Sequence, residues 1–251
     1  MAYGRVPESG QIVHTAGPLG VEHGAKILYV NKVATDGWLQ ARDDRSHALV
    51  PLAKYTRVAI VGSANRRTTF RVDDGPAKDR LLSLSDANAL DYLGSKEPVR
   101  ALARAVVTYG KYVEHWISIA RGGQALDQQM GTLEIAGLSL QVTMNSVWDG
   151  RFSPIPAGEY KVLLPDTPHK GNMTRFYRET EPSLKFDQVW FPIQYGDNSR
   201  YVHVGNLSEG CTTVLDLARW ADVHEALISH RGPDSRSVAT LVVRGTPERA
   251  R

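Results

Sequence analysis

The sequence predicts a mainly β protein with some α-helix, built in two parts. Short runs of apolar, β-branched and aromatic residues recur along most of the chain, separated by polar and glycine-containing segments. Only three segments carry helical signals. The pair Gly122-Gly123 ends the second of these segments and is the most natural linker. We therefore expect an accessory region over residues 1–123 and a second domain over residues 124–251, and the chain is long enough to bury a core in each.

Composition excludes several classes of protein. The 251 residues are 42% hydrophobic and 23% charged, which is unlike a disordered or collagen-like chain. The single cysteine, Cys211, allows no internal disulfide. No apolar run approaches the roughly 18 residues of a membrane span, and the first thirty residues lack the apolar block of a signal peptide. We expect a chain without a membrane span that is made in the cytoplasm without a Sec signal.

Charge is distributed unevenly between the halves of the chain. Residues 1–125 hold 17 Lys and Arg against 12 Asp and Glu, whereas residues 126–251 hold 13 against 15. A basic bias of this size is typical of a solvated surface. Arg66, Arg67 and Arg71 would carry any attraction for a polyanion, but no basic stripe is interleaved with aromatic residues. The sequence therefore does not predict nucleic-acid binding.

The accessory region begins with strand-like segments and continues with helical ones. The strands are expected over residues 27–30, 38–41, 48–50, 58–61 and 68–72. Ser85 is a suitable N-cap for a short helix through Tyr92, and Gly94 is a suitable residue to end it. A longer helix is expected from Ser95, with Pro98 tolerated in its first turn. Apolar residues spaced three and four apart form its inner stripe: Val99, Leu102, Val106, Tyr109, Val113, Trp116 and Ala120.

The second domain returns to β structure. Residues 132–135 and 138–142 alternate around Ala136-Gly137, which is the pattern of a β-hairpin. One amphipathic helix is expected over residues 215–230. Further strands are expected over residues 160–164, 188–191, 200–204 and 238–243.

His203 and Cys211 form the strongest candidate site. His203 lies in an expected strand, and Cys211 follows eight residues later across a loop. Gly205-Asn206 can reverse the chain, and Gly210 leaves the backbone free to approach a ligand. If Cys211 opens the returning strand, the thiol and the imidazole can face each other, and an imidazolium would stabilise the thiolate nucleophile. The spacing is equally compatible with a buried, inert Cys211 and a hydrogen-bonded His203 that has no catalytic role.

Two motifs in the second domain resemble those of a known family. The segment Ser208-Glu209-Gly210-Cys211 with His203 upstream, together with Pro-Ile-Pro-Ala-Gly-Glu-Tyr at residues 154–160, resembles the L,D-transpeptidase (YkuD-like) catalytic domain. The nearest branch is the compact one, with type VI secretion L,D-transpeptidase effectors and related phage-type proteins. The resemblance spans residues 131–243. It implies a β-sandwich with one main helix and a peptidoglycan-modifying cysteine acyltransferase without metal or cofactor.

The resemblance also implies roles for individual residues. Cys211 would be the nucleophile and His203 the general acid and base, while backbone N–H groups around Gly210 would hold the oxyanion. The loop around the nucleophile would be shaped by Ser208, Glu209 and Gly205. Candidate substrate-binding residues are Tyr201, Asn206, Thr212, His169 and Arg175.

Departures from the family pattern leave the acceptor open. Common L,D-transpeptidases have a second histidine where this chain has Glu209, and an arginine where it has Thr213. The acyl group could pass to a second stem peptide, to a D-amino acid or to water, which correspond to transpeptidation, exchange and L,D-carboxypeptidase activity.

Partners and alternatives follow from the same comparison. Because the substrate lies outside the cytoplasmic membrane, the resemblance implies a secreted antibacterial effector that acts in the periplasm of a target bacterium. It would have an immunity protein and a component of the secretion machine as partners. One alternative is a non-catalytic cell-wall-binding or phage-structural module of the same fold. Another is a papain-like amidase or peptidase with His224 as its base.

Overall fold

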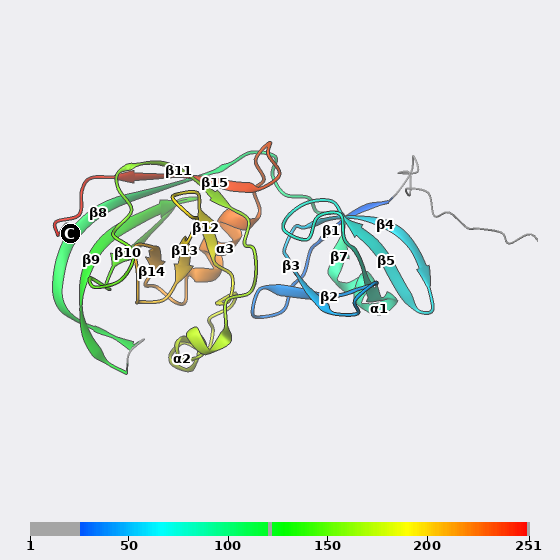
Figure 1. Ribbon diagram of the computed structural model, residues 1–251, viewed down its shortest axis with the longest axis horizontal. Coiled ribbons are helices and arrows are strands. Elements are labelled where there is room, and N and C mark those ends of the chain that lie inside the picture. The colour runs from blue at the N-terminus through cyan, green and yellow to red at the C-terminus, as the bar shows by residue number, and fades with distance from the viewer. Residues whose placement is uncertain (1–25, 120–121, 250–251) are drawn as a thin grey trace, which may run out of the picture.

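The computed structural model describes residues 26–119 and 122–249, and it confirms the prediction of a mainly β chain. The described residues are 45% strand and 12% helix. Two β structures follow one another along it, an N-terminal sheet and a closed barrel (Figure 1). Residues 1–25, on which the expectation of no Sec leader rests, lie outside the described residues.

The N-terminal structure is a sheet with strand order β3-β2-β6-β5-β4-β1-β7. Its buried core is formed by side chains such as Phe70, Leu82 and Val72, which have no exposed surface. The strands are β1 Ile27–Val30, β2 Trp38–Asp43, β3 Leu49–Ala53, β4 Arg57–Ala64, β5 Arg67–Val72, β6 Leu81–Ser85 and β7 Leu93–Gly94.

The short helix of this region was predicted correctly. Helix α1 spans Asp86–Tyr92, and the Oγ of Ser85 accepts a hydrogen bond from the N–H of Asn88 at 3.2 Å. Its end differs from the expectation, because the chain becomes extended at Leu93 and forms β7 rather than a glycine cap. The N-cap could be predicted because it is a local interaction.

The long helix expected from Ser95 is wrong: this segment forms β8, a strand over Ala103–Ser118. Ala103, Ala105 and Val107 are buried in alternation, which is the period of a strand. Farther along, two irregularities in the pairing of β8 with β9 shift the phase of this alternation. The apolar residues then fall three and four apart, as they would in a helix.

Eight strands close into a barrel in the order β10-β14-β13-β12-β11-β15-β8-β9. β8 pairs with β15 on one side and with β9 on the other, so the strand that was missed is the one that closes the ring. The result is a closed barrel and not the expected sandwich. The other strands are β9 Gln124–Ile135, β10 Leu138–Asn145, β11 Gly158–Leu163, β12 Phe191–Ile193, β13 Arg200–Val204, β14 Thr212–Val214 and β15 Ser237–Arg244.

Because β8 belongs to the barrel, the boundary between the two parts lies earlier in the chain than the expected position after residue 123. The sheets divide the described chain between Gly94 and Ala103, whereas Gly123 lies between two paired strands of the barrel. The hairpin of β9 and β10 is present as predicted, with φ of 48° at Ala136 and 79° at Gly137.

Helices α2 and α3 and the short turn η2 accompany the barrel in the described part of the chain. Helix α3 spans Trp220–Ile228, shorter than the expected 215–230, because Asp216 accepts a hydrogen bond from the N–H of Arg219 in a preceding turn. The sequence did not indicate helix α2, Arg175–Thr180, or the 3-10 turn η2, Gly171–Met173. The strand expected over residues 188–191 begins only at Phe191, because the N–H of Val189 bonds to the carbonyl of Phe186 in a turn.

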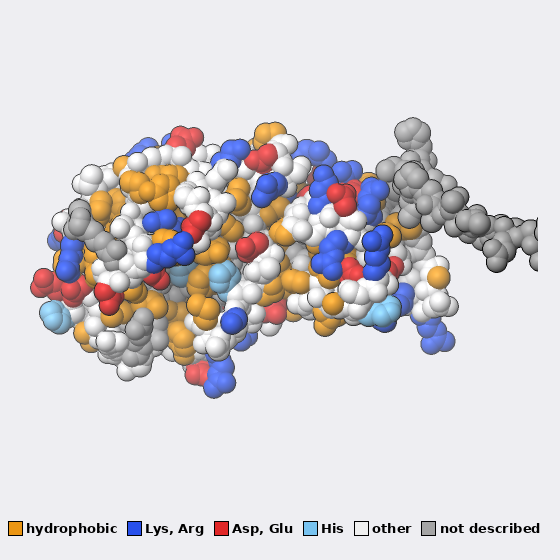
Figure 2. All heavy atoms as spheres, viewed as in Figure 1, with side chains coloured by type: hydrophobic (Ala, Val, Ile, Leu, Met, Phe, Trp, Pro, Cys, Tyr) orange, Lys and Arg blue, Asp and Glu red, His pale blue; other side chains and the backbone are white. Residues whose placement is uncertain are grey.

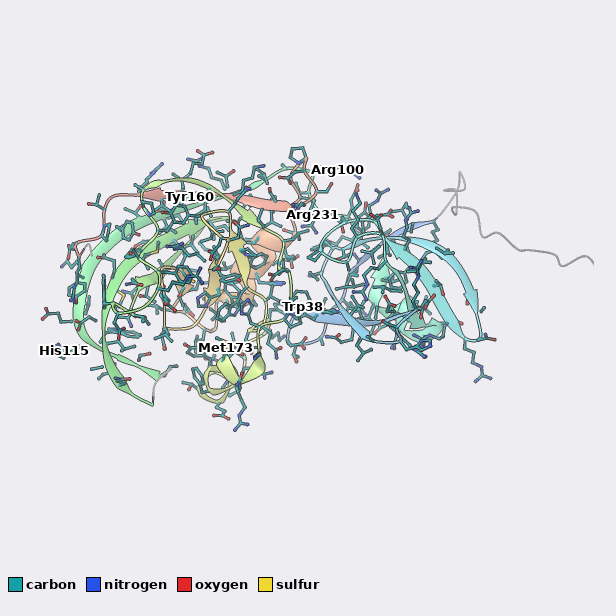
Figure 3. All side chains as sticks on the ribbon, in the orientation of Figure 1. Trp38, Arg100, His115, Tyr160, Met173 and Arg231 are labelled. Atoms are coloured by element: carbon teal, nitrogen blue, oxygen red, sulfur yellow. The ribbon has the colours of Figure 1, made fainter. Side chains whose placement is uncertain are left out.

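The N-terminal sheet and the barrel share a packed junction. Trp38 and Tyr55 come from the N-terminal part but belong to the hydrophobic core of the barrel, and Figure 3 shows Trp38 where the two parts meet. The indole N–H of Trp38 donates to the carbonyl of Gln188 at 3.3 Å, and the hydroxyl of Tyr55 donates to Glu225 of α3 at 2.8 Å. The N-terminal sheet is therefore part of one packed structure.

Basic side chains of the N-terminal sheet lie among acidic ones, as Figure 2 shows on one face of the molecule. Arg80 pairs with Asp43 at 2.8 Å, and Arg71 pairs with Asp73 at 3.0 Å. This interleaving is typical of a solvated surface. None of the helices in the described parts of the chain has the length and apolar character needed to cross a membrane.

Candidate active site

The candidate site is built on two neighbouring strands of the barrel, β13 and β14. They run parallel, with Val202 opposite Thr212 and His203 opposite Thr213. The strand that follows Cys211 is therefore not the expected returning strand, because the loop over residues 205–211 brings the chain round to run parallel to β13. Cys211 is the last residue of this loop.

The register places Cys211 and His203 on the same face of the barrel wall. Val202, Val204 and Val214 point into the barrel core, so the alternate residues point outward. Two rows of outward-pointing residues cross the strands β12, β13 and β14. They are Pro192, Tyr201 and Cys211 in one row, and Trp190, His203 and Thr213 in the next.

Hydrogen bonds define the tautomer of His203. Its Nδ1 lies 2.9 Å from the carbonyl oxygen of Val204, which only accepts, so Nδ1 carries the proton. Nε2 then has the free electron pair and accepts from the hydroxyl of Thr213 at 3.0 Å. This leaves Nε2 as the atom that could act as a base, with Thr213 in contact with it.

An aromatic stack covers His203. The imidazole of His203 lies 4.0 Å from the indole of Trp190 at an angle of 15°, and the imidazole of His169 lies 3.9 Å from the same indole at 14°. Two rings this close and this parallel cannot share one face of an indole, so Trp190 lies between them. Tyr201 meets the edge of this stack, with its ring 4.9 Å from that of His169. The structure thus brings together three predicted residues, His203, His169 and Tyr201.

Burial keeps the thiol and the imidazole neutral. Cys211 is 6% exposed and His203 is 4% exposed. Desolvation raises the pKa of the Cys211 thiol to about 11, against a smaller opposing effect of hydrogen bonds from the backbone and the charge of Arg200. Desolvation likewise lowers the pKa of His203 to about 4. The expected thiolate–imidazolium pair is therefore not the state of this conformation at pH 7.

The hydrogen bonds of Cys211 are with backbone groups. Its Sγ accepts from the N–H of Tyr201 at 3.4 Å and lies 4.0 Å from the carbonyl oxygen of Glu209. In the described part of the chain no hydrogen bond joins Cys211 to His203. The two side chains share one face, but Thr213 occupies the hydrogen-bonding position of the imidazole.

Two glycines shape the loop over residues 205–211. Gly210 has a φ of 74°, and a Cβ there would lie closer than van der Waals contact to the carbonyl oxygen of Ser153. Gly205 has a φ of 141°, and its Cβ would lie 2.8 Å from the hydroxyl of Tyr177. Both positions exclude a side chain on grounds of backbone conformation and space.

Polar side chains from four other elements hold the loop. The hydroxyl of Tyr177 in α2 accepts from the N–H of Asn206 at 3.0 Å, and Ser118 at the end of β8 donates to the side chain of Asn206 at 2.8 Å. Gln128 of β9 donates to the carbonyl of Asn206 at 3.3 Å. Ser146, just after β10, accepts from the N–H of Ser208 at 2.7 Å. The loop is thus anchored to the surrounding barrel.

Gly210 does not play the predicted part of an oxyanion donor here. Its N–H donates to the side-chain oxygen of Asn145 at 2.9 Å. Ser208 shapes the loop as expected, since its hydroxyl donates to the carbonyl of Cys211 at 2.9 Å. Glu209 accepts from the N–H of Arg151 at 2.8 Å and so connects the loop to the neighbouring segment of residues 147–153.

Other predicted residues lie away from the thiol. The side chain of Arg175 is 77% exposed and pairs with Glu179 at 2.9 Å. Thr212 faces the barrel interior beside Val202, and its buried hydroxyl has no partner in the described chain. His224 contacts Phe191, whose side chain also faces the interior, so it lies on the opposite side of the wall from Cys211. The papain-like alternative with His224 as base is therefore wrong.

Sequence reasoning missed Trp190 and Arg200. The guanidinium of Arg200 lies between the rings of Phe152 and Tyr195, at 4.7 and 4.8 Å, and its charge lowers the pKa of Cys211. Trp190 lies next to the imidazole only because β12 pairs with β13. No local sequence signal indicates this pairing, whereas the position of Arg200 at the start of the histidine strand could have drawn attention to it.

The described residues contain no group of three or more His, Cys, Asp or Glu side chains that could hold a metal ion. No family model, curated protein or solved structure matches this chain.

Proposed function

We propose that this protein is a cysteine acyltransferase that acts on peptidoglycan stem tetrapeptides, as an L,D-transpeptidase, a D-amino acid exchange enzyme or an L,D-carboxypeptidase. One observation carries the proposal: His203 and Cys211 share the outer face of adjacent strands, and the hydrogen bond to Val204 leaves Nε2 of His203 unprotonated. The Ser208-Glu209-Gly210-Cys211 motif and its resemblance to the L,D-transpeptidase family support the choice of substrate.

The chemistry would be a two-step acyl transfer. As the substrate carbonyl arrives, the thiol proton of Cys211 passes to Nε2 of His203, and Sγ bonds to the carbonyl carbon. The C–N bond then breaks, and the leaving nitrogen takes the proton from His203 and departs as D-alanine. The acyl group remains on sulfur as a thioester until an acceptor attacks it.

Access to the thiol requires a change from the described conformation. Thr213 must release Nε2, and the hydroxyl rotation that does so leaves its β-strand in place. Arg200 would then be the nearest cation to the developing negative charge, since it already lowers the pKa of Cys211.

The proposal extends to location and partners. A cysteine acyltransferase for stem peptides works where peptidoglycan lies, so we propose a secreted effector that reaches the periplasm of a target bacterium. A producing cell would then carry an immunity protein, and a component of the secretion machine would deliver the enzyme.

Purified protein incubated with a disaccharide tetrapeptide tests the activity. We expect mass spectrometry to detect loss or exchange of D-alanine and a thioester adduct on Cys211, both absent in Cys211→Ala. Arg104→Gln is the control. Arg104 is an exposed residue of β8, which lies opposite β13 in the strand order of the closed barrel. Unchanged tetrapeptide with the folded wild-type protein would refute the proposal.

A non-catalytic wall-binding or phage-structural module is the second candidate. The observation that favours it is the burial of both Cys211 and His203, which are neutral and not hydrogen-bonded to each other. This candidate predicts that the protein sediments with purified peptidoglycan, that Cys211→Ala binds equally well, and that no product forms.

A further inference from the structure

A cavity of about 450 Å³ adjoins the row of outer-face residues that includes Cys211. Pro192 and Tyr201, the other two members of that row, line the cavity. Its opposite wall is formed by Gly75 and Pro76, which follow β5 of the N-terminal sheet. Because the N–H of Tyr201 bonds to the sulfur of Cys211, the cavity begins one residue away from the candidate nucleophile.

Charges of both signs line this cavity. Asp166, Asp197 and Arg236 are its charged residues. Asp197 already pairs with Arg151 at 2.8 Å. The carboxylate of Asp166 accepts from the N–H of Thr167, and the guanidinium of Arg236 forms no hydrogen bond or ion pair within the described residues. Among the described residues, one carboxylate and one guanidinium of this cavity thus have no ion-pair partner.

Asp166 lines the same cavity as Tyr201, whose ring meets the edge of the aromatic stack. After desolvation, its negative charge is the largest cause that raises the pKa of Tyr201, and the same charge acts on His169. A ligand ammonium held by Asp166 would therefore lie next to Tyr201, which borders Cys211.

We propose that this cavity binds the ammonium and carboxylate of an amino acid, with Asp166 facing the ammonium and Arg236 facing the carboxylate, and that it is the acceptor site for acyl transfer. A zwitterion offers each of the two charges a charge-assisted hydrogen bond, which is stronger than a hydrogen bond to neutral water. The acceptor assignment rests on the proposed function, and it selects an amine acceptor over hydrolysis.

The bound ammonium releases one proton to solvent, and its nitrogen attacks the thioester carbonyl carbon on Cys211. A C–N bond forms and the C–S bond breaks. The nitrogen gives a second proton to Nε2 of His203, and the departing sulfur takes that proton back to become the thiol.

Binding of three small probes to the intact protein tests the cavity. D-alanine carries both charges, D-alaninamide lacks the carboxylate, and D-lactate lacks the ammonium. By isothermal titration we expect D-alanine to bind about tenfold more tightly than either analogue, because each charge-assisted contact contributes to the affinity. Arg236→Gln should lower the affinity for D-alanine to that of the wild type for D-alaninamide. Asp166→Asn should lower it to that of the wild type for D-lactate.

Two surface variants are the matched controls. Arg104→Gln on β8 and Glu159→Gln on β11 each remove one exposed charge and line no part of this cavity. Equal binding of all three probes, or D-alanine binding unaffected by both cavity variants, would overturn the proposal.

A tetrapeptide reaction with deuterated D-alanine separates this inference from the proposed function. We expect Arg236→Gln to shift the ratio of exchange to hydrolysis about tenfold toward hydrolysis, and Arg104→Gln to keep the wild-type ratio. An unchanged ratio overturns the acceptor assignment while the acyltransferase activity stands. Absence of a thioester in the wild type, with selective D-alanine binding intact, refutes the proposed function and the acceptor role but supports the amino-acid site.

Discussion

Individual residues in this protein are strongly affected by burial. Cys211, His203 and His224 are all almost completely enclosed, and desolvation shifts the pKa of each toward its neutral form. A side chain that the sequence marks as potentially reactive is therefore in its neutral form in the folded chain at pH 7. This gives two predictions at the scale of the residue.

The first prediction concerns the reactivity of Cys211. Burial raises the pKa of its thiol to about 11. We therefore expect iodoacetamide to label the native protein at pH 7 at a rate at least about tenfold lower than that of the urea-unfolded protein. The labelling rate of the native protein should still rise above pH 9. A native thiol that titrates below pH 8 would contradict the neutral state and would restore the thiolate–imidazolium pair.

The second prediction concerns His224 and the stability of the fold at acid pH. Both ring nitrogens of His224 are buried without hydrogen-bond partners in the described chain, and desolvation lowers its pKa to about 3. The unfolded chain, with a His pKa of about 6.5, binds the proton more readily, so stability is lost as the pH falls below 6.5. Between pH 6.5 and pH 5 this loss should be about 2 kcal/mol.

A leucine of similar size should remove this dependence on pH. We expect His224→Leu to unfold in urea with a higher free energy than the wild type at pH 5. The side chain packs between Phe186 and Phe191, which suits an apolar replacement. His203→Gln should also reduce the slope of stability against pH, because desolvation lowers the pKa of His203 to about 4. An equal slope of stability against pH in His224→Leu and wild type would contradict this account.

At the scale of the element, the loop over residues 205–211 depends on glycine. Gly210 combines a φ of 74° with the close carbonyl of Ser153, whereas Gly137 in the β9–β10 hairpin has a φ of 79° and no atom within 4 Å of a Cβ. The two glycines therefore separate the cost of backbone conformation from the cost of the clash.

We expect Gly137→Ala to cost about 1–2 kcal/mol of unfolding free energy, from the backbone alone. Gly210→Ala should cost about 1–3 kcal/mol more, because the methyl group must displace its neighbours. Urea denaturation of both variants measures the difference, and equal losses would show that the segment around Ser153 moves freely.

Elements also differ in how well the sequence predicts them. Ser85 and α1, the hairpin at Ala136-Gly137 and the strand of His203 were predicted because their signals are local. β8 was not, since its bulges shift the apolar spacing and its partners β15 and β9 lie elsewhere in the chain. That error produced the expected helix, whereas the expected sandwich came from the resemblance to the L,D-transpeptidase family.

The candidate site was predictable in part. Cys211 and His203 follow from residue type and spacing; Tyr201 lies beside Cys211, and Trp190 separates His169 from His203. The aromatic partner Trp190, the cation Arg200 and the anchoring side chains of Ser118 and Asn145 come from other strands and turns. Their positions depend on strand pairing, which the sequence did not indicate.

At the scale of the whole molecule, the N-terminal sheet and the barrel should unfold together. Trp38 is almost fully buried in the barrel core, and Tyr55 bonds to Glu225 across the junction. We expect a single calorimetric transition for the wild type. Trp38→Ala should lower the unfolding free energy by about 3–5 kcal/mol or separate the transition into two.

Leu90 of α1 provides the control, because it is 87% exposed. Leu90→Ala should change stability by less than about 0.5 kcal/mol. Two separate transitions in the wild type, or an unaffected Trp38→Ala, would contradict the packed junction. Gly75 and Pro76, in the loop after β5, line the 450 Å³ cavity, so the N-terminal part of the chain also contributes to the proposed site.

The sequence alone determined the β character of this chain, its local caps and turns, and the two residues on which the functional proposal rests. These features depend on neighbours within a few positions, so they can be recognised without the fold. The tertiary structure decided that the strands close into a barrel, that β13 and β14 run parallel, and that Thr213 rather than Cys211 bonds to His203. It also decided the charge state of the site, because burial comes from segments distant in the sequence and sets the pKa of both groups.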